Sequence, residues 1–376
     1  MKYFMHGVDK NAICESMGRL KELNFDAVVT SFNQETIDSA LEHGLEPYVF
    51  SGTYSMTEAF KDDRYLCEDI NGNPQIWFNS TCPNKKDVRE YNIEAIRKKA
   101  SARGVKGIFL DGARFSSPCS GRDNESFFTC FCDDCRQKAE AFGLDFIRMR
   151  RDVKRLYDEI NSGNGVASWA NALAGGLDMI PFFQSFPGVF DWLNFRRICT
   201  TEHVLDVAKA VKESKEGCLM ALYIFTPSLA GLVGQSYIDL RRHVDIFSPM
   251  IYRAYHRAEG PACLNTELFS MAEMITNGNG GKWREAVRMI SRLTGFCLPG
   301  YEGPEDIEKG LPPCCIGVET AKARALLGPN KMLAPIIQLD DKALNSSIKE
   351  VQGAGADGIN FYSYDKEWIG MLPALS

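Results

Sequence analysis

Short apolar segments that read as strands alternate with helical patterns along the whole chain, and this alternation constrains the fold more than any other feature. Such alternation is typical of βα units, whose strands lie parallel in a sheet covered by helices. Several of the helical stretches end in Gly or Asn, as helices commonly do. Eight strand-like segments fit a closed (β/α)8 barrel, the TIM-barrel form of the α/β class. They lie near residues 3–8, 26–32, 46–51, 106–111, 218–225, 245–252, 332–338 and 357–363.

The regular alternation is interrupted twice, each time after the carboxyl end of a predicted strand. One insertion spans approximately residues 112–215, after the fourth strand, and the other spans approximately residues 253–330, after the sixth. Insertions at this end of a barrel build the walls of an active site. The 376 residues contain no repeat, low-complexity tract or linker, so we expect a single domain over residues 1–376.

The composition excludes some classes of partner. The formal net charge of −6, with both signs mixed along the chain, provides no basic patch for nucleic acid. No apolar run is long enough to cross a membrane, and the first residues show no signal-peptide pattern. We therefore expect a cytoplasmic protein with no nucleic-acid or membrane partner and no organic cofactor, and the sequence leaves a homo-oligomer open.

A carboxylate ends the fourth predicted strand, in the segment GVKGIFLDGARF. Ile108, Phe109 and Leu110 form an apolar run that suits a strand buried on both faces. Because an ionised carboxylate within the sheet would be costly to bury, Asp111 must lie where the strand ends. The carboxyl ends of barrel strands carry catalytic groups, which makes Asp111 a candidate catalytic residue. The alternative is an aspartate that caps the next helix or pairs with Arg114.

Four cysteines lie close together in the first insertion, in the segment CSGRDNESFFTCFCDDC. They are Cys119, Cys130, Cys132 and Cys135, and the last three form a C-x-C-x2-C pattern. This set matches the ligands of a closed tetrahedral zinc site, and soft thiolates select zinc over magnesium or calcium. Four sulfurs leave no open position, so such a zinc would be structural and would fix the loop after Asp111. The alternative is a group of reduced thiols in a chain with 13 cysteines.

Two segments resemble those of a known superfamily. The segment STCPNKKDVREYNIEAIRKKASARGVKGIFLDGARF is similar to a pattern in glycoside-hydrolase-like TIM barrels of an uncharacterised family, and FTCFCDDC is similar to the cysteine cluster of family 42 β-galactosidases. The resemblance implies a TIM barrel that acts on a carbohydrate. The chain departs from family 42 because no Asn-Glu pair ends its fourth strand. In α-fucosidases and α-galactosidases an aspartate at that point is the nucleophile, and the resemblance implies that role for Asp111.

Glycoside hydrolysis normally needs a second carboxyl group. Arg114 would favour the ionised form of Asp111, which suits a nucleophile. Asp340 follows the seventh predicted strand, and Glu319 lies in the second insertion between an apolar run and a helical one. Each has a plainer interpretation, because Asp340 could cap a helix and Glu319 could be an ordinary helix-start residue. The weaker candidates are Asp365 and Glu267.

A sugar site needs aromatic platforms for the apolar ring faces and polar groups for the hydroxyls. Several residues near strand ends or in the first insertion could supply them, although each aromatic residue could instead pack in the core. The candidates for substrate binding are Arg114, Trp192, Arg196, Tyr223, Tyr252, Gln338 and Tyr362.

The sequence therefore predicts a glycoside hydrolase with Asp111 as nucleophile at the end of the fourth strand and Glu319 or Asp340 as its partner. Two alternatives stay open, a non-catalytic carbohydrate-binding barrel and a lyase or isomerase on the same fold. A lyase or isomerase would normally use a Lys, a His or a divalent metal at a strand end. The predicted strand ends offer only His6 and carboxylates, which disfavours that class.

Overall fold

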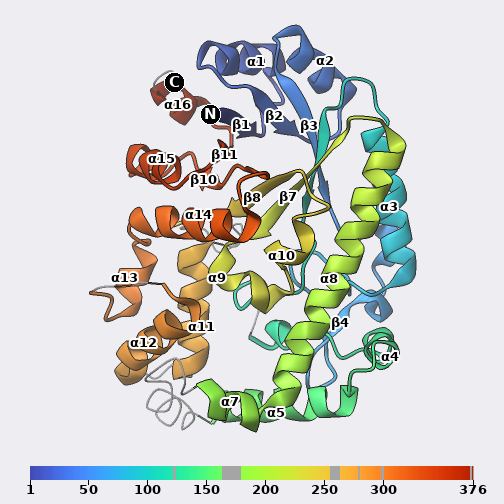
Figure 1. Cartoon of the computed structure of the whole chain (residues 1–376), viewed down its shortest axis with the longest axis vertical. Helices are drawn as coiled ribbons and strands as arrows, with labels where there is room; N and C mark the ends of the chain where they lie inside the picture. The colour runs from blue at the N-terminus through green and yellow to red at the C-terminus, as the bar shows by residue number, and fades with distance from the viewer. Residues whose placement is uncertain are drawn as a thin grey trace.

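Parallel strands close into a barrel in the computed structural model (Figure 1), which describes residues 1–121, 124–162, 179–254, 263–277, 280–296, 298, 300–372 and 375. Within these residues the strand order is β10-β11-β1-β2-β3-β6-β7-β8-β9, and β10 also pairs with β8 through Ile336 and Met250, which closes the ring. The barrel strands are β1 (Lys2–His6), β2 (Ala27–Thr30), β3 (Glu46–Gly52), β6 (Gly107–Asp111), β7 (Leu219–Phe225), β8 (Ile246–Met250), β9 (Met332–Leu333), β10 (Ile336–Gln338) and β11 (Gly358–Tyr362).

All predicted barrel strands are present in the described part of the chain, and the seventh is divided in two. Between β9 and β10 lie Ala334 and Pro335. Proline has no N–H group and cannot donate to a strand ladder, so the strand is interrupted at this point. The Pro335 carbonyl still accepts a hydrogen bond from the Asn360 N–H at 2.9 Å, and β9 and β10 together fill one position of the barrel. The predicted (β/α)8 TIM barrel is confirmed.

Helices surround the barrel, as Figure 1 shows. In α2, Thr36, Ile37 and Ala40 are buried on the face that packs inward, and the Asn33 side chain accepts a hydrogen bond from the Thr36 N–H at 3.1 Å. This bond satisfies an N–H that the helix itself leaves unpaired. The helices that cover the barrel are α1 (Ile13–Glu22), α2 (Gln34–Glu42), α3 (Lys86–Ala100), α8 (Pro187–Ser214), α10 (Tyr237–Leu240), α14 (Cys314–Leu327), α15 (Leu344–Gly353) and α16 (Lys366–Met371).

Among the described residues, no helix combines the length and the apolar character that a membrane span would need.

Both predicted insertions contain further short elements at one end of the barrel. A two-stranded antiparallel ribbon, β4 (Cys67–Glu68) and β5 (Pro74–Gln75), follows β3 and lies beside the first insertion through a bridge between Asp69 and Thr129. The first insertion holds η3 (Asn124–Phe127), α4 (Asp133–Ala141), α5 (Phe146–Asn161) and α7 (Met179–Ser185). The second holds α11 (Leu264–Thr276), η6 (Gly280–Lys282), α12 (Trp283–Thr294) and α13 (Pro304–Glu308).

Aromatic side chains fill the barrel interior. The rings of Phe4 in β1 and Phe109 in β6 lie 5.9 Å apart although these strands are not neighbours, so the two side chains meet inside the barrel. Tyr223 in β7 stacks on Phe109 with ring centroids 4.8 Å apart. Because side chains alternate between the two faces of a strand, Asp111 lies on the same interior face as Phe109. The stack of rings therefore forms a floor beneath the mouth at which Asp111 lies.

Candidate active site and metal centre

Asp111 is the last residue of β6 and lies opposite Gly52 of β3 in the sheet. Its Oδ1 accepts a hydrogen bond from the Gly112 N–H at 2.8 Å. Gly112 has φ +69°, a left-handed conformation in which glycine is favoured, and it turns the chain sharply away from the strand. Among the described residues Asp111 caps no helix and has no ion-pair partner within 4.0 Å. The structure therefore supports neither helix capping nor an ion pair with Arg114 as the role of Asp111.

Burial raises the pKa of the Asp111 carboxyl group above its ordinary value. The Gly112 N–H and the charge of Arg114 act in the opposite direction but are smaller effects. The sequence-based expectation that Arg114 would favour the ionised form of Asp111 is therefore outweighed, because desolvation penalises the charge more than Arg114 stabilises it. A carboxyl group in this environment is better suited to donate a proton than an ordinary aspartate is.

Arg114 is held by the loop that follows β6. Its guanidinium donates to the Phe115 carbonyl at 2.9 Å and to Ser120 Oγ at 3.1 Å, and it lies 4.6 Å from the centroid of the Phe225 ring. The side chain is almost fully buried. It therefore orders the loop beside Asp111, and its N–H groups are directed at protein atoms.

Three predicted tyrosines come together at the barrel mouth. The Tyr223 hydroxyl shares a hydrogen bond of 2.8 Å with His6 Nδ1 and accepts one from Asn360 Nδ2 at 3.3 Å. Tyr362 lies between His6 and Tyr252, with ring-centroid distances of 5.2 and 5.4 Å. Burial lowers the pKa of His6 to about 4, so the imidazole is neutral at ordinary pH. The result is an uncharged aromatic surface below Asp111.

Gln338 ends β10 and is buried, and its Oε1 accepts a hydrogen bond from the Ala254 N–H at 3.2 Å. This hydrogen bond therefore links the end of β10 to the segment that follows β8.

Trp192 and Arg196 were predicted to bind substrate, but the structure places them in a second core beneath the first insertion. The Trp192 Nε1–H donates to the Thr129 carbonyl at 3.0 Å, and the Arg196 guanidinium lies 3.9 Å from the Trp192 ring centroid. Arg196 is fully buried and donates to the backbone carbonyls of Ser116, Phe127, Thr129 and Leu232. Both side chains are buried and donate hydrogen bonds to loop carbonyls. We therefore assign them a structural role in place of the predicted contact with substrate.

Glu319 lies in α14, and both of its carboxylate oxygens are occupied. Oε2 accepts from Thr226 Oγ1 at 2.5 Å and from the Ser228 N–H at 3.0 Å, and Oε1 accepts from Ser228 Oγ and Lys322 Nζ, each at 2.8 Å. Thr226 is the N-cap of the short helix α9 (Pro227–Ala230). Glu319 therefore fastens α14 to the start of α9, which fits a structural carboxylate.

The other predicted carboxylates differ in their surroundings. Asp340 is exposed two residues beyond the end of β10, and it makes no hydrogen bond or ion pair within the described residues. Asp365 caps α16 by accepting from the Glu367 and Trp368 N–H groups. Glu267 is buried and accepts from Ser117 Oγ at 2.5 Å and from the Cys119 N–H at 3.1 Å. Only Asp340 combines a position beyond a strand end with free carboxylate oxygens.

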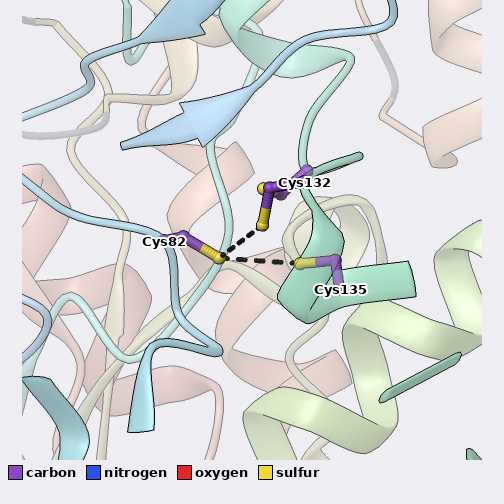
Figure 2. Close-up of side chains that lie close together, drawn as sticks. Cys82, Cys132 and Cys135 are labelled. Atoms are coloured by element: carbon purple, nitrogen blue, oxygen red, sulfur yellow. Dashed lines mark hydrogen bonds between the residues drawn. The ribbon is translucent and has the colours of Figure 1, made fainter. Parts of the chain in front are cut away.

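Four buried cysteines form a candidate metal centre, and one of them differs from the prediction. Cys82, Cys130, Cys132 and Cys135 place their sulfurs within 4.8 Å of one another. Figure 2 shows the Cys132 and Cys135 side chains directed at Cys82, at sulfur–sulfur distances of 3.7 and 3.5 Å. Cys119 lies outside this group. Its sulfur is 3.7 Å from Thr266 Oγ1, because the loop turns toward α11.

The geometry of the four sulfurs fits a tetrahedral thiolate site. Zinc–sulfur bonds of about 2.3 Å place neighbouring sulfurs roughly 3.8 Å apart, close to the two distances from Cys82. Amide groups also point at the sulfurs, since Glu68 N–H donates to Cys130 at 3.3 Å and Asn84 Nδ2 donates to Cys135 at 3.2 Å. Such donors are the outer contacts that orient and stabilise thiolate ligands. These four residues could together hold a metal ion.

The spacing of cysteines within the first insertion did not indicate Cys82, because this residue lies far upstream of the other three. A local signal was nonetheless present, since Cys82 begins the Cys-Pro-Asn turn before α3. The Asn84 N–H donates back to Cys82 Sγ at 3.4 Å while the Asn84 side chain reaches Cys135. A cysteine followed by a turn that aims N–H groups at its sulfur is typical of a metal ligand.

The fold is similar to that of several solved carbohydrate-active proteins. A β-galactosidase from Halorubrum lacusprofundi matches with a TM-score of 0.62 and 12% identity, over 97% of this chain and 53% of that chain. A β-galactosidase from Marinomonas ef1 matches with a TM-score of 0.60 and 11% identity, over 97% and 54% of the two chains. The chain thus spans about half the length of these two proteins.

The catalytic domain of a β-amylase from Paenibacillus polymyxa matches over 96% of this chain and 92% of its own length, with a TM-score of 0.54 and 12% identity. No protein-family model and no curated protein sequence matches the chain. The class that the fold defines is therefore the (β/α)8 TIM barrel, and at these identities the likeness extends to the fold alone.

Proposed function

We propose that this protein hydrolyses glycosidic bonds at the carboxyl end of its barrel, with Asp111 as the proton donor. The observation that carries the proposal is the raised pKa of a carboxyl group that ends a barrel strand and faces the interior. One carboxyl group of a glycosidase must be protonated at the working pH in order to protonate the leaving oxygen, and burial is the usual way to achieve this. Similarity in fold to proteins named as β-galactosidases and a β-amylase supports a carbohydrate substrate.

The proposed partner of Asp111 is Asp340. It lies just beyond the seventh strand position, it is exposed, and its oxygens are free within the described residues, so it can attack a sugar or activate water. Glu319 is less suitable because four donors already occupy its oxygens. The role that the sequence favoured for Asp111, nucleophile, is less consistent with a carboxyl group whose protonated form is favoured.

The sugar ring would rest on the aromatic surface of His6, Tyr223, Tyr252 and Tyr362. A neutral imidazole and aromatic rings offer an apolar platform for a ring face, and the nearby hydroxyls can bond to sugar hydroxyl groups. No residue of this surface carries a formal charge near neutral pH, which favours a neutral sugar at this position.

The experiment compares Asp111→Asn, Asp340→Asn and Asp365→Asn on a panel of aryl glycosides with good and poor leaving groups. Loss of a proton donor slows substrates with poor leaving groups far more than those with good ones, by about 10²–10⁴-fold. We expect this pattern in Asp111→Asn, a loss on all substrates in Asp340→Asn, and wild-type rates in Asp365→Asn, which alters only an exposed helix cap. An equal loss on all substrates in Asp111→Asn would assign it the nucleophile role instead.

The pH dependence gives a second test. The proton donor acts in its protonated form, so kcat/KM falls as the pH rises through the pKa of Asp111, which burial places above the ordinary aspartate value. The residual activity of Asp111→Asn on a substrate with a good leaving group should lack this alkaline limb. Tight glycan binding with no turnover by the wild type would contradict the proposal and support a binding protein.

A further inference from the structure

A fifth cysteine lies against the four-cysteine group. Cys67, in β4, is buried, and its thiol interacts with the thiols of Cys130 and Cys82. It lies outside the set of four sulfurs that are mutually within 4.8 Å. A closed tetrahedral site is complete with four thiolates, so the structure leaves Cys67 as a reduced thiol beside two metal ligands.

The backbone keeps Cys67 next to this group. The segment that follows it lies along the segment of Cys130, because the Phe131 N–H donates to the Glu68 carbonyl at 2.9 Å and the Glu68 N–H donates to Cys130 Sγ at 3.3 Å. The Cys82 N–H donates to the Tyr65 carbonyl at 2.7 Å, which holds the third segment against the same stretch of chain. The three sulfurs therefore belong to segments that hydrogen bonds hold together without any metal.

A surface cavity reaches the edge of the group. This cavity has a volume of about 480 Å³, and its lining includes Asn84, Asp134 and Lys138. Asn84 is also the residue whose backbone N–H contacts Cys82 Sγ and whose side chain contacts Cys135 Sγ. Asn84 thus contacts both the cavity and two of the sulfurs, which places this edge of the group next to solvent.

We propose that Cys67 is the resolving cysteine of an oxidation site, where it forms a disulfide with Cys130 or Cys82 when hydrogen peroxide reaches the group. One thiol sulfur attacks a peroxide oxygen, the O–O bond breaks, and a sulfenic acid and one water form. The second thiol sulfur then attacks the sulfenic sulfur, the S–O bond breaks, and a second water leaves. Two thiols and one peroxide thus become one disulfide and two waters. Where the attacking sulfur is a metal-bound thiolate, hydroxide leaves instead of water, and it takes a proton from solvent to form that water. A metal held by the four cysteines would lose one thiolate ligand in this step and would be released.

This inference is independent of glycosidase activity, and its main test needs no variant. Zinc-loaded full-length protein is treated with one equivalent of hydrogen peroxide, alkylated, digested and mapped by mass spectrometry, while a chromogenic chelator follows zinc release. We expect a disulfide-linked peptide pair that joins Cys67 to Cys130 or Cys82. Zinc should be released in proportion to this disulfide, and reduction by dithiothreitol should restore zinc binding. Links confined to the four ligands, with Cys67 alkylated as a free thiol, would overturn the proposal.

Two variants sharpen the result. Cys67→Ser removes the fifth thiol and leaves the four ligands, so it should bind zinc as the wild type does and, on oxidation, form links only among ligands. Cys218→Ser is the matched control, because Cys218 is also buried but lies in the main core outside the group. It should give the wild-type linkage. If Cys67→Ser fails to bind zinc, Cys67 is itself a ligand and the resolving role is rejected.

Discussion

Replacement of Arg196 by methionine should strongly destabilise the protein, because this buried cation organises the loops below the metal centre. Its guanidinium donates to four backbone carbonyls, and within the described part of the chain only the Thr129 carbonyl keeps another donor, the Trp192 N–H. In Arg196→Met the carbonyls of Ser116, Phe127 and Leu232 lose this partner. Each buried acceptor left unpaired costs about 1–3 kcal/mol, so the three together cost roughly 3–9 kcal/mol.

Removal of the buried charge recovers part of the desolvation cost, so we expect the lower end of this range, about 3 kcal/mol. The assay is urea unfolding followed by circular dichroism, with the free energy of unfolding extrapolated to water. The matched control is Arg197→Met, the next residue, whose exposed side chain pairs with Asp239 and whose loss should cost at most about 1 kcal/mol. Equal destabilisation by the two variants would refute the structural role of Arg196.

Two further predictions concern the candidate metal centre and His6 at the barrel mouth. Cys82→Ser should lose bound zinc while Cys119→Ser keeps it, as measured by elemental analysis of the purified proteins, and the opposite result would restore the ligand set that spacing favoured. Burial lowers the pKa of His6 from 6.5 to about 4, so the unfolded chain binds a proton more readily, and this group costs stability as the pH falls from 6.5 toward 4. The melting temperature of His6→Gln should therefore fall less than that of the wild type over this interval, and parallel curves would show that His6 does not titrate in this way.

The barrel could be predicted because each strand has a local signature. Apolar runs such as Ile108–Leu110 must be covered on both faces, and the polar residue that follows must lie at the strand end, so the sequence located Asp111 as well as the strand. The division of the seventh strand at Pro335 was also implicit in the sequence, since proline cannot join the ladder.

The site could be predicted only in part, because roles depend on contacts between distant segments. Nothing near Arg196 indicates that loop carbonyls from four places converge on its guanidinium. Similarly, the start of a helix does not reveal that Glu319 meets two donors from Ser228 and one from Thr226. The spacing pattern included three of the four clustered cysteines and missed the fourth, Cys82, whose proximity comes from the tertiary fold.

The placement of Cys82 before β6 and of the other three cysteines after it has a consequence for biosynthesis. The ligands span roughly 50 residues, and joining the ends of such a loop costs about 3 kcal/mol of chain entropy unless something holds them. All four cysteines precede residue 136 in the chain, so they are synthesised together with β1, β2, β3 and β6 and before the strands of the other half of the barrel. Metal captured at that moment would lock the first half-barrel before its partner strands are made. The supply of such a metal during translation, rather than afterwards, would then govern the yield of correctly folded protein.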